Sequence, residues 1–243
     1  MAGIDGAATK IAYVNSLSGS TYGTALDVTS YTDAKICASI TENFSVDEVL
    51  DDGIGCGSNV GFVKDVRAGL IQYGFGLSGN MGFQNGFDRI LAQFFGSESA
   101  PAEQTVGEDD WLHVFKFATL SNQRWGTLVY ETGSASVMEG ISTYTQRVQI
   151  SMSAVKGYVT WSADLLANAI AFTSGINSPV NTTADLSALA LLDSELVFAE
   201  CTHTFRMKAV DDDGADTALG SGDKFAITSF DLEMETPLKL YRN

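Results

Sequence analysis

Alternation of apolar with small or polar residues marks one stretch of the chain as a strand. It runs from Leu70 to Met81, just before the clearest helical pattern in the sequence. A period of two that includes aromatic residues predicts a β-strand with one buried face. The apolar face consists of Ile71, Tyr73, Phe75, Leu77 and Met81, and the opposite face of Leu70, Gln72, Gly74, Gly76, Ser78 and Asn80.

The period then changes to that of a helix. Five apolar residues at i, i+3, i+4, i+7 and i+8 form one stripe and predict a short amphipathic helix over about 85–95. These core-helix residues are Phe87, Ile90, Leu91, Phe94 and Phe95. Asn85 is expected to cap the first turn, and Gly96 to end the helix in the left-handed conformation.

A long segment, 45–68, interrupts the strands before this unit. Acidic residues gather in its first part and glycines at its centre. This pattern is typical of a long hairpin that leaves the sheet. Segments of this length inside a compact domain are usually functional or disordered, so an interaction arm and a disordered insertion are both open.

Further strands follow at short spacing along the chain. The pattern predicts them over 34–44, 111–117, 125–131, 141–153, 158–167, 196–209 and 225–235, with the third expected to pair with the second. Residues 1–33 are expected to form an arm with a short strand at 10–14, and a helical turn is expected at 186–192. Many strands with one helix predict a mainly β, antiparallel sandwich or barrel, forming a single domain over 34–243.

The last strand carries two contrasting faces. Phe230, Leu232 and Met234 are expected to face the core. Asp231, Glu233 and Glu235 alternate with them and form an acidic ribbon on the other side.

Charge and cysteine content narrow the class of protein. Thirty acidic and 14 basic residues give a net charge of −16, which argues against binding nucleic acid by neutralising phosphates. Three cysteines without a CxxC motif suggest free thiols in a reducing compartment. No signal peptide and no membrane-spanning run is recognised, so we expect folding in a cytoplasm and no membrane partner.

Motifs that could carry chemistry are weak here. The glycines at 74, 76 and 79 match G-x-G-x-x-G but lie inside a strand, not at a strand-to-helix turn. The turn Asp211–Asp216 resembles a calcium loop, yet its spacing fails that of an EF-hand. His113 and His203 alone make no zinc site. We therefore expect no enzyme, no cofactor and no metal site, with weak cation binding at Asp211–Asp216 left open.

Three stretches together resemble the tail tube proteins of long-tailed bacteriophages. The first joins residues 77–81 to the helix at 86–96. The second is the pair 144–153 and 157–167, and the third joins 219–223 to 227–232. The resemblance lies in the order and spacing of all three and covers about residues 69–243.

The resemblance implies a structural virion protein. Tail tube proteins self-assemble into hexameric rings that stack into a tube, through which DNA passes without specific binding. It also implies tape measure, terminator and distal tail proteins as partners, and a place in the virion tail after assembly in the host cytoplasm.

Within that family, the long loop bridges to the next ring. Two faces are candidates for lining the lumen: the acidic ribbon and the small polar face of the strand at 70–81. The lumen candidates are Asp231, Glu233, Glu235, Gln72, Ser78 and Asn80. The inter-ring candidates are Asp47, Glu48, Asp51, Asp52, Val60 and Phe62.

Two other functions stay open at this point. One is another virion component, such as a tail terminator or a head decoration protein. The other is a β-sandwich carbohydrate-binding domain, which would need aromatic platforms; Trp111, Trp125 and Trp161 are the candidates, although they look like core or pairing positions.

Overall fold

The computed structural model places most of the predicted β-domain. The residues it describes are 10–16, 22–31, 34–36, 38–51, 65–82, 86–98, 102–103, 111–112, 114–117, 124–133, 136–153, 158–172, 178–189, 205–206, 224–225 and 229–236. The turn Asp211–Asp216, both histidines and all three cysteines lie outside them.

The fold is mainly β and antiparallel, as predicted. Its strands are β1 (Ile11–Asn15), β2 (Lys35–Ile36), β3 (Ser39–Asp51), β4 (Asp65–Asn80), β5 (Gly96–Glu98), β6 (Ala102–Glu103), β7 (Trp111–Leu112), β8 (Phe115–Phe117), β9 (Gly126–Gly133), β10 (Ser136–Ser153), β11 (Val159–Ala167), β12 (Ala169–Phe172), β13 (Phe205–Arg206), β14 (Lys224–Phe225) and β15 (Ser229–Glu235). Its helical elements are η2 (Val28–Ser30), α1 (Phe87–Phe95) and α2 (Thr183–Ala188).

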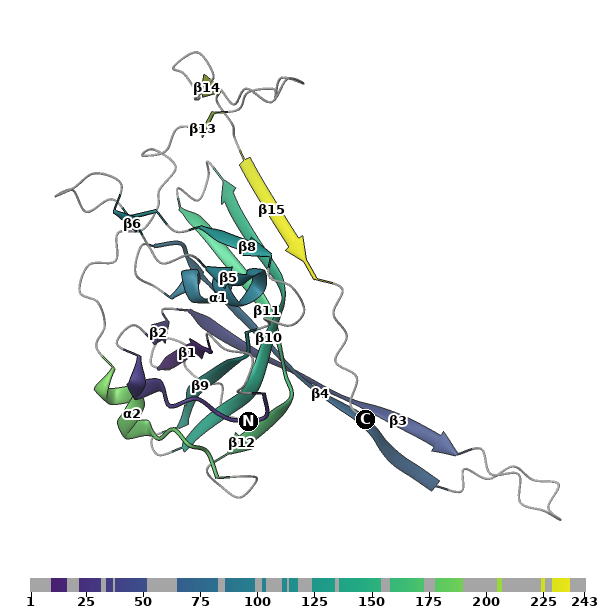
Figure 1. Ribbon diagram of the computed structural model, residues 1–243. Helices are drawn as coiled ribbons and strands as arrows, with labels where there is room; N and C mark the ends of the chain where they lie inside the picture. The colour runs from purple at the N-terminus through teal and green to yellow at the C-terminus, as the bar shows by residue number, and fades with distance from the viewer. Residues whose placement is uncertain are drawn as a thin grey trace.

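Strand β10 connects two halves of one curled sheet. The main path runs β2-β1-β9-β10-β11-β4-β3, and β12 and β15 also pair with β10 (Figure 1). The first part of β10 pairs with β9 and β12, and its second part pairs with β11 and β15. The change occurs where Ser142 has a φ of 51° and the register against β9 shifts. This irregularity lets a single strand belong to both halves.

The two halves differ in how their faces are covered. Every residue of β1 is buried, because alternate side chains enter two different apolar clusters. Val28 and Leu186 cover one face of this half from η2 and α2. In the half formed by β15, β10, β11, β4 and β3, α1 covers one face, and the other face carries the polar side chains described below.

Helix α1 packs against the apolar side of the sheet. Phe87, Ile90 and Phe94 are buried as predicted, and Phe87 stacks on the buried ring of Trp161 at 5.0 Å. Leu91 and Phe95 are only partly buried. The predicted stop is also confirmed, since Gly96 has a φ of 81° and its N–H bonds to the carbonyl of Ala92.

The predicted cap of α1 is wrong. The N-cap is Gly86, with a φ of 78° and no side-chain hydrogen bond, and Asn85 lies outside the described residues. Gly86 fits because a Cβ there would lie 2.8 Å from the Ile36 side chain and the left-handed backbone disfavours other residues. Close packing of the helix start against β2 therefore replaces a polar cap.

Two further predictions about pairing need correction. Segment 111–117 does not pair with 125–131: β8 pairs with β5 and β7 with β6, while β9 pairs with β1 and β10. The helical turn expected at 186–192 begins earlier, as α2, because Thr182 and Asp185 form a capping box at its start. Periodicity alone misses both features, since pairing partners and polar caps leave no apolar pattern.

The N-terminal strand is part of the sheet. Strand β1 pairs with β9 along its whole length and with β2 at its start. The short strand predicted near 10–14 is thereby confirmed. The division of the chain at residue 33 stays a prediction.

Candidate assembly interface

One continuous polar surface crosses five strands of the sheet. Register pairs carry it from β15 through β10, β11 and β4 to β3, and paired residues share a face. One row across it joins Glu233, Gln149, Ser162, Ser78 and Ser39. We call this surface the polar face; its members are Asp231, Glu233, Glu235, Arg147, Gln149, Ser151, Thr160, Ser162, Asp164, Gln72, Gly74, Gly76, Ser78, Asn80, Ser39, Thr41, Asn43 and Ser45.

The two lumen candidates are therefore parts of one surface. The acidic ribbon of β15 and the small polar residues of β4 lie on the same side of the same sheet, separated by β10 and β11. The sequence presents them as alternatives because about 150 residues separate them along the chain. Leu166, which pairs with Gly74, is the apolar residue that interrupts this side.

Acidic groups surround the one cation of the polar face. The Nε atom of Arg147 lies 2.7 Å from a carboxylate oxygen of Glu233, and its Nη1 atom lies 3.4 Å from Asp164. Its Nη2 atom donates to the side chain of Gln149 at 3.0 Å. Asp231 accepts hydrogen bonds from Gln149 and Ser151. Four carboxylates and one guanidinium give this surface a net negative charge. Each nitrogen of the guanidinium lies near an acceptor on a neighbouring side chain.

Glycine makes part of the polar face smooth. A Cβ on Gly74 would lie 2.6 Å from the backbone oxygen of Asn43, so β3 and β4 need glycine there to approach. Within the G-x-G-x-x-G match at 74–79, Gly74 thus serves a close contact between strands. None of the match lies at the start of a helix.

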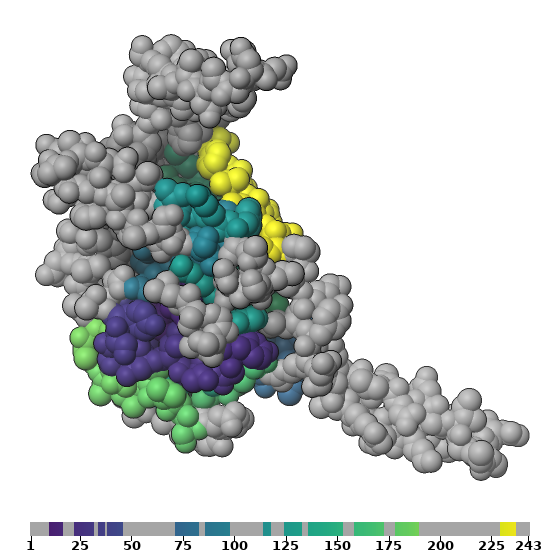
Figure 2. Space-filling view, in the orientation of Figure 1, coloured from purple at the N-terminus to yellow at the C-terminus, as the bar shows by residue number. Residues whose placement is uncertain are grey.

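The polar face ends at two open strand edges. Among the residues that the structure describes, no strand pairs with the outer edge of β15 or with that of β3. Figure 2 shows β15, in yellow, on the surface of the molecule. Exposed rows of N–H and C=O groups favour pairing with another chain, so these edges are candidate interfaces.

Apolar side chains are exposed at the same two edges. Phe230 and Leu232 on β15 are 37% and 39% exposed, and Phe44 on β3 is 38% exposed. The prediction that Phe230, Leu232 and Met234 face the core is right in direction, because they pair with Met152, Ile150 and Val148. Phe230 and Leu232 are nevertheless not buried as that prediction implies, because β15 is an edge strand with one partner.

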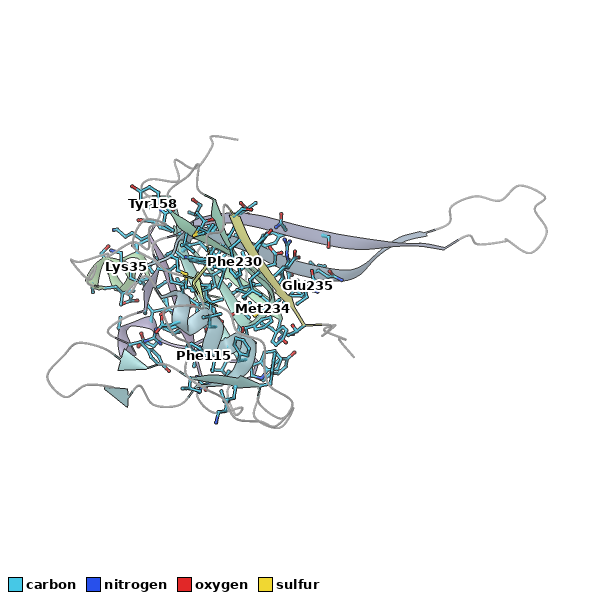
Figure 3. All side chains as sticks on the ribbon, turned by 90° about the horizontal axis from the view of Figure 1, so that it is seen from above. Lys35, Phe115, Tyr158, Phe230, Met234 and Glu235 are labelled. Carbon is cyan, nitrogen blue, oxygen red and sulfur yellow. The ribbon has the colours of Figure 1, made fainter. Side chains whose placement is uncertain are left out.

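Strands β3 and β4 continue beyond the sheet as a two-stranded ribbon. Strand β11 pairs with β4 only from Tyr73 onward, while β3 follows β4 back to the pair Asp51–Asp65. Figure 3 shows the ribbon leaving the body. Residues 45–51 and 65–68 of the expected loop are therefore strand, which corrects its boundaries. A two-stranded ribbon is marginally stable alone in water, so this one is suited to contact with a partner.

The inter-ring candidates divide between the ribbon and the segment beyond it. Asp47, Glu48 and Asp51 belong to β3, on the ribbon. Asp52, Val60 and Phe62 lie outside the described residues. Their role in contacts between rings stays a prediction.

A partly buried hydrogen bond fixes the base of the ribbon to the body. The hydroxyl of Tyr130 on β9 donates to the carboxylate of Glu42 on β3 at 2.6 Å. Burial, and next the hydrogen bond to Glu42, raise the pKa of Tyr130 well above its usual range. The neutral phenol therefore holds β3 against the other half of the sheet. Nothing in the spacing of apolar and polar residues predicts this contact.

Other kinds of site find little support in the described part of the chain. No group of three or more metal-ligating residues occurs there, and no helix there could span a membrane. Trp161 is buried under Phe87, and Trp125 packs against Tyr22 and Tyr144. Two of the three candidate aromatic platforms are thus engaged in packing.

Comparison with known proteins gives a distant structural likeness. No protein-family model and no curated protein matches the chain. The sheath-tube complex of an extracellular contractile injection system (PVC) in the extended state is similar at a TM-score of 0.37 and 10% identity, over 68% of this chain and 86% of that one. The sheath/tube terminator of that system gives 0.37 and 10%, over 70% and 96%.

A third similar structure is the tube terminating cap of an anti-feeding prophage. Its TM-score is 0.35 and its identity 12%, over 67% of this chain and 88% of that one. The chain is therefore distantly similar in structure to sheath/tube and tube-terminator proteins of contractile injection systems. These values assign neither a family nor a role.

Proposed function

We propose that this protein is a structural subunit of a bacteriophage tail tube. Copies join edge to edge into hexameric rings, and the rings stack into a tube with the polar face toward the bore. The observation that carries the proposal is that one sheet has a continuous polar face and two open edges. The resemblance of three sequence stretches to tail tube proteins supplies the family and the number six.

Edge-to-edge assembly accounts for the exposed groups. Joining β15 of one copy to β3 of the next satisfies both rows of backbone groups and closes the sheet into a barrel. The apolar residues at the two edges are covered in the same step. An isolated subunit leaves them in water.

The charge of the polar face suits a channel for DNA. Carboxylates repel phosphates, and a surface whose one arginine is already engaged offers no free cation to hold them. DNA then passes without specific binding. The net charge of −16 extends this repulsion beyond the face itself.

The ribbon of β3 and β4 serves to connect one ring to the next. The inter-ring candidates Asp52, Val60 and Phe62 lie between β3 and β4 in the sequence. Tape measure, terminator and distal tail proteins complete the list of partners, in the virion tail. We propose no catalytic function.

The competing proposal is a tail terminator or a head decoration protein. The number of copies along the tail separates a tube subunit from either of them. A tube subunit is present in many stacked rings, whereas a terminator is confined to one end of the tube. The test is electron microscopy of the purified chain together with its copy number per particle. We expect rings or tubes and a high copy number along the tail; a strict monomer at high concentration, or a few copies per particle, contradicts the proposal.

A further inference from the structure

Two segments that are far apart in the sequence together cover one face of β1 and β9. One is 26–31, around η2, and the other is 180–189, which carries α2. Helix α2 packs against η2 and β9, and η2 packs against β1. The buried side chains of the two segments are Val28, Asn181, Leu186 and Leu189. The cover therefore rests on a small number of buried contacts.

The side chain of Asn181 joins the two segments to each other. Its Oδ1 atom accepts from the N–H of Val28, and its Nδ2 atom donates to the carbonyl of Leu26. The same Nδ2 atom, at 2.5 Å, and the backbone N–H of Asn181, at 3.1 Å, donate to the carboxylate of Glu139 on β10. One buried amide therefore holds both segments to each other and to the sheet.

The buried carboxylate of Glu139 receives its hydrogen bonds from the second segment. The N–H of Val180, at 3.4 Å, is the third donor beside the two from Asn181. A buried charge is costly unless donors satisfy it, so Glu139 favours the covered state only while these groups are in place. If the segment moves away, water reaches the carboxylate and replaces the donors. Opening therefore leaves no buried charge without a partner.

We propose that segments 26–31 and 180–189 form one lid, which opens and closes as a unit with Asn181 as its latch. The face beneath the lid surrounds the carboxylate of Glu139 with short apolar side chains, those of Ala12, Val14, Val129 and Val137. Segments with few buried apolar contacts open at a lower free energy than global unfolding. The open lid presents an apolar surface with one acidic group, which the closed subunit hides.

The first segment is fixed beyond both of its ends, so it can move only as a loop. Before it, the N–H of Gly23 donates to the hydroxyl of Ser142 at 2.7 Å. After it, the carbonyl of Ala34 accepts from the N–H of Tyr13 at 2.7 Å.

Three other contacts must break together with the latch. They are the bond from the N–H of Leu26 to the hydroxyl of Thr127, the bond from Lys10 to Ser187, and the contact of the Arg89 guanidinium with the Tyr31 ring. The two hydrogen bonds are partly buried or exposed, so water can replace them.

Hydrogen exchange of the whole chain, followed by NMR, tests whether the lid is one unit. The N–H of Tyr31 bonds to the carbonyl of Val28, and that of Leu186 to the carbonyl of Thr182, so each reports on its own segment. The N–H of Tyr13 in β1 reports on the sheet. One lid predicts the same protection factor for Tyr31 and Leu186, at least about tenfold below that of Tyr13. Protection equal to that of Tyr13, or a difference of more than about tenfold between the two reporters, overturns the proposal.

Thr182→Ala is the decisive variant, because Thr182 belongs to the second segment alone and caps α2 by accepting from the N–H of Asp185. Loss of this N-cap should lower the protection of Leu186 about fivefold. One lid predicts the same fall at Tyr31, with Tyr13 unchanged. A fall confined to Leu186 means that α2 opens alone, and an equal fall at all three reporters means that no separate lid exists; either result overturns the proposal.

Asn181→Ala tests the latch itself. It should lower the protection of Tyr31 and Leu186 about 10- to 100-fold, because it removes the bonds that join the segments to each other and to Glu139. A smaller fall than that in Thr182→Ala overturns the assignment of Asn181 as the latch.

Gln93→Leu is the matched control, because it removes another buried amide that bonds to β10 but lies outside the lid. It should lower the protection of Tyr13 and leave Tyr31 and Leu186 unchanged. A fall at Tyr31 and Leu186 as large as that in Thr182→Ala would show that their protection depends on the whole subunit, which also overturns the proposal. These measurements concern the single subunit, so their outcome is separate from that of the proposed tube.

Discussion

The Oε1 atom of Gln93 accepts a hydrogen bond of 2.7 Å from the backbone N–H of Thr145. This bond occurs between the end of the β9 pairing at Thr143 and the start of the β15 pairing at Arg147. The Nε2 atom of Gln93 also donates to the carbonyls of Arg124 and Thr143, at 3.1 and 3.4 Å. A helix side chain thus satisfies the backbone where β10 passes from one half of the sheet to the other.

Replacing this amide should destabilise the subunit. Gln93→Leu keeps the approximate size but leaves a buried N–H and two carbonyls with fewer partners, which we expect to lower the free energy of unfolding by about 1–3 kcal/mol. Urea unfolding measures it. Gln72→Leu, at an exposed glutamine on the polar face, is the control and should change stability by less than about 0.5 kcal/mol. Equal effects at both positions would contradict this role of Gln93.

A second buried amide holds the segment around α2 to the sheet. Asn181 donates through Nδ2 to Glu139 at 2.5 Å and to the carbonyl of Leu26 at 3.0 Å. It also accepts from the N–H of Val28 at 2.8 Å. Glu139 and Asn181 are fully buried, so the pair depends on one donor facing one acceptor.

Asn181→Asp should therefore unfold more easily than the parent. It removes the amide donor and places a second carboxylate against Glu139, and leaving a buried charge without its partner costs about 3–5 kcal/mol. The double variant with Glu139→Gln restores one donor and one acceptor, and we expect its melting temperature to recover in part. Asn43→Asp, at an exposed position, is the control. A melting temperature for Asn181→Asp equal to that of Asn43→Asp would refute the prediction.

The alkaline stability of the subunit depends on buried tyrosines. Burial raises the pKa of Tyr130, and that of Tyr13 as well. Their stabilising effect is complete below about pH 10, the usual tyrosine pKa, and falls as pH rises further, because the unfolded chain loses protons that the folded chain keeps. Each such tyrosine adds a slope of about 1.4 kcal/mol per pH unit.

Tyr130→Phe should reduce that slope by the share of one tyrosine. The measurement is the free energy of unfolding in urea between pH 8 and about pH 11.5. Tyr158→Phe, at an exposed tyrosine, is the control and should leave the slope unchanged. An identical slope for Tyr130→Phe and the parent would show that the phenol ionises in the folded state as readily as in the unfolded one.

Much of the fold could be predicted from periodicity. Alternation located β4, the second part of β10 and β11 with the correct buried faces, and the apolar stripe located α1. Partners across the sheet could not be predicted in this way, because β15 and β4 are far apart in sequence and meet only through β10 and β11. For the same reason the pattern predicts two separate lumen candidates, whereas both lie on one face of the sheet.

Contacts made by single polar side chains also could not be predicted from the sequence. Gln93 interrupts the apolar stripe of α1 as an ordinary polar residue would, and nothing in its spacing shows that it is buried. The exposure of Phe230 and Leu232 was missed because alternation predicts which way a residue points and not whether anything lies over it.

The ribbon gives a prediction that separates ring formation from stacking. Deleting Asp51–Gly61 should leave a folded subunit, because β11 and the core pair with β4 only from Tyr73 onward. We expect an unchanged melting temperature and no tubes, measured by sedimentation and electron microscopy. Asp51→Asn with Asp52→Asn removes the charge alone and is the matched control. Normal tube growth after the deletion would rule out a bridging role.

The most direct test of the account is a helical reconstruction from tubes of the purified protein, at a resolution that separates strands. We predict a closed barrel in which β15 of each subunit adjoins β3 of the next, with Asp231, Arg147, Asp164 and Ser78 facing the bore. A wall that presents these residues to the outside, or a protein that stays monomeric with both edges free at high concentration, would contradict it.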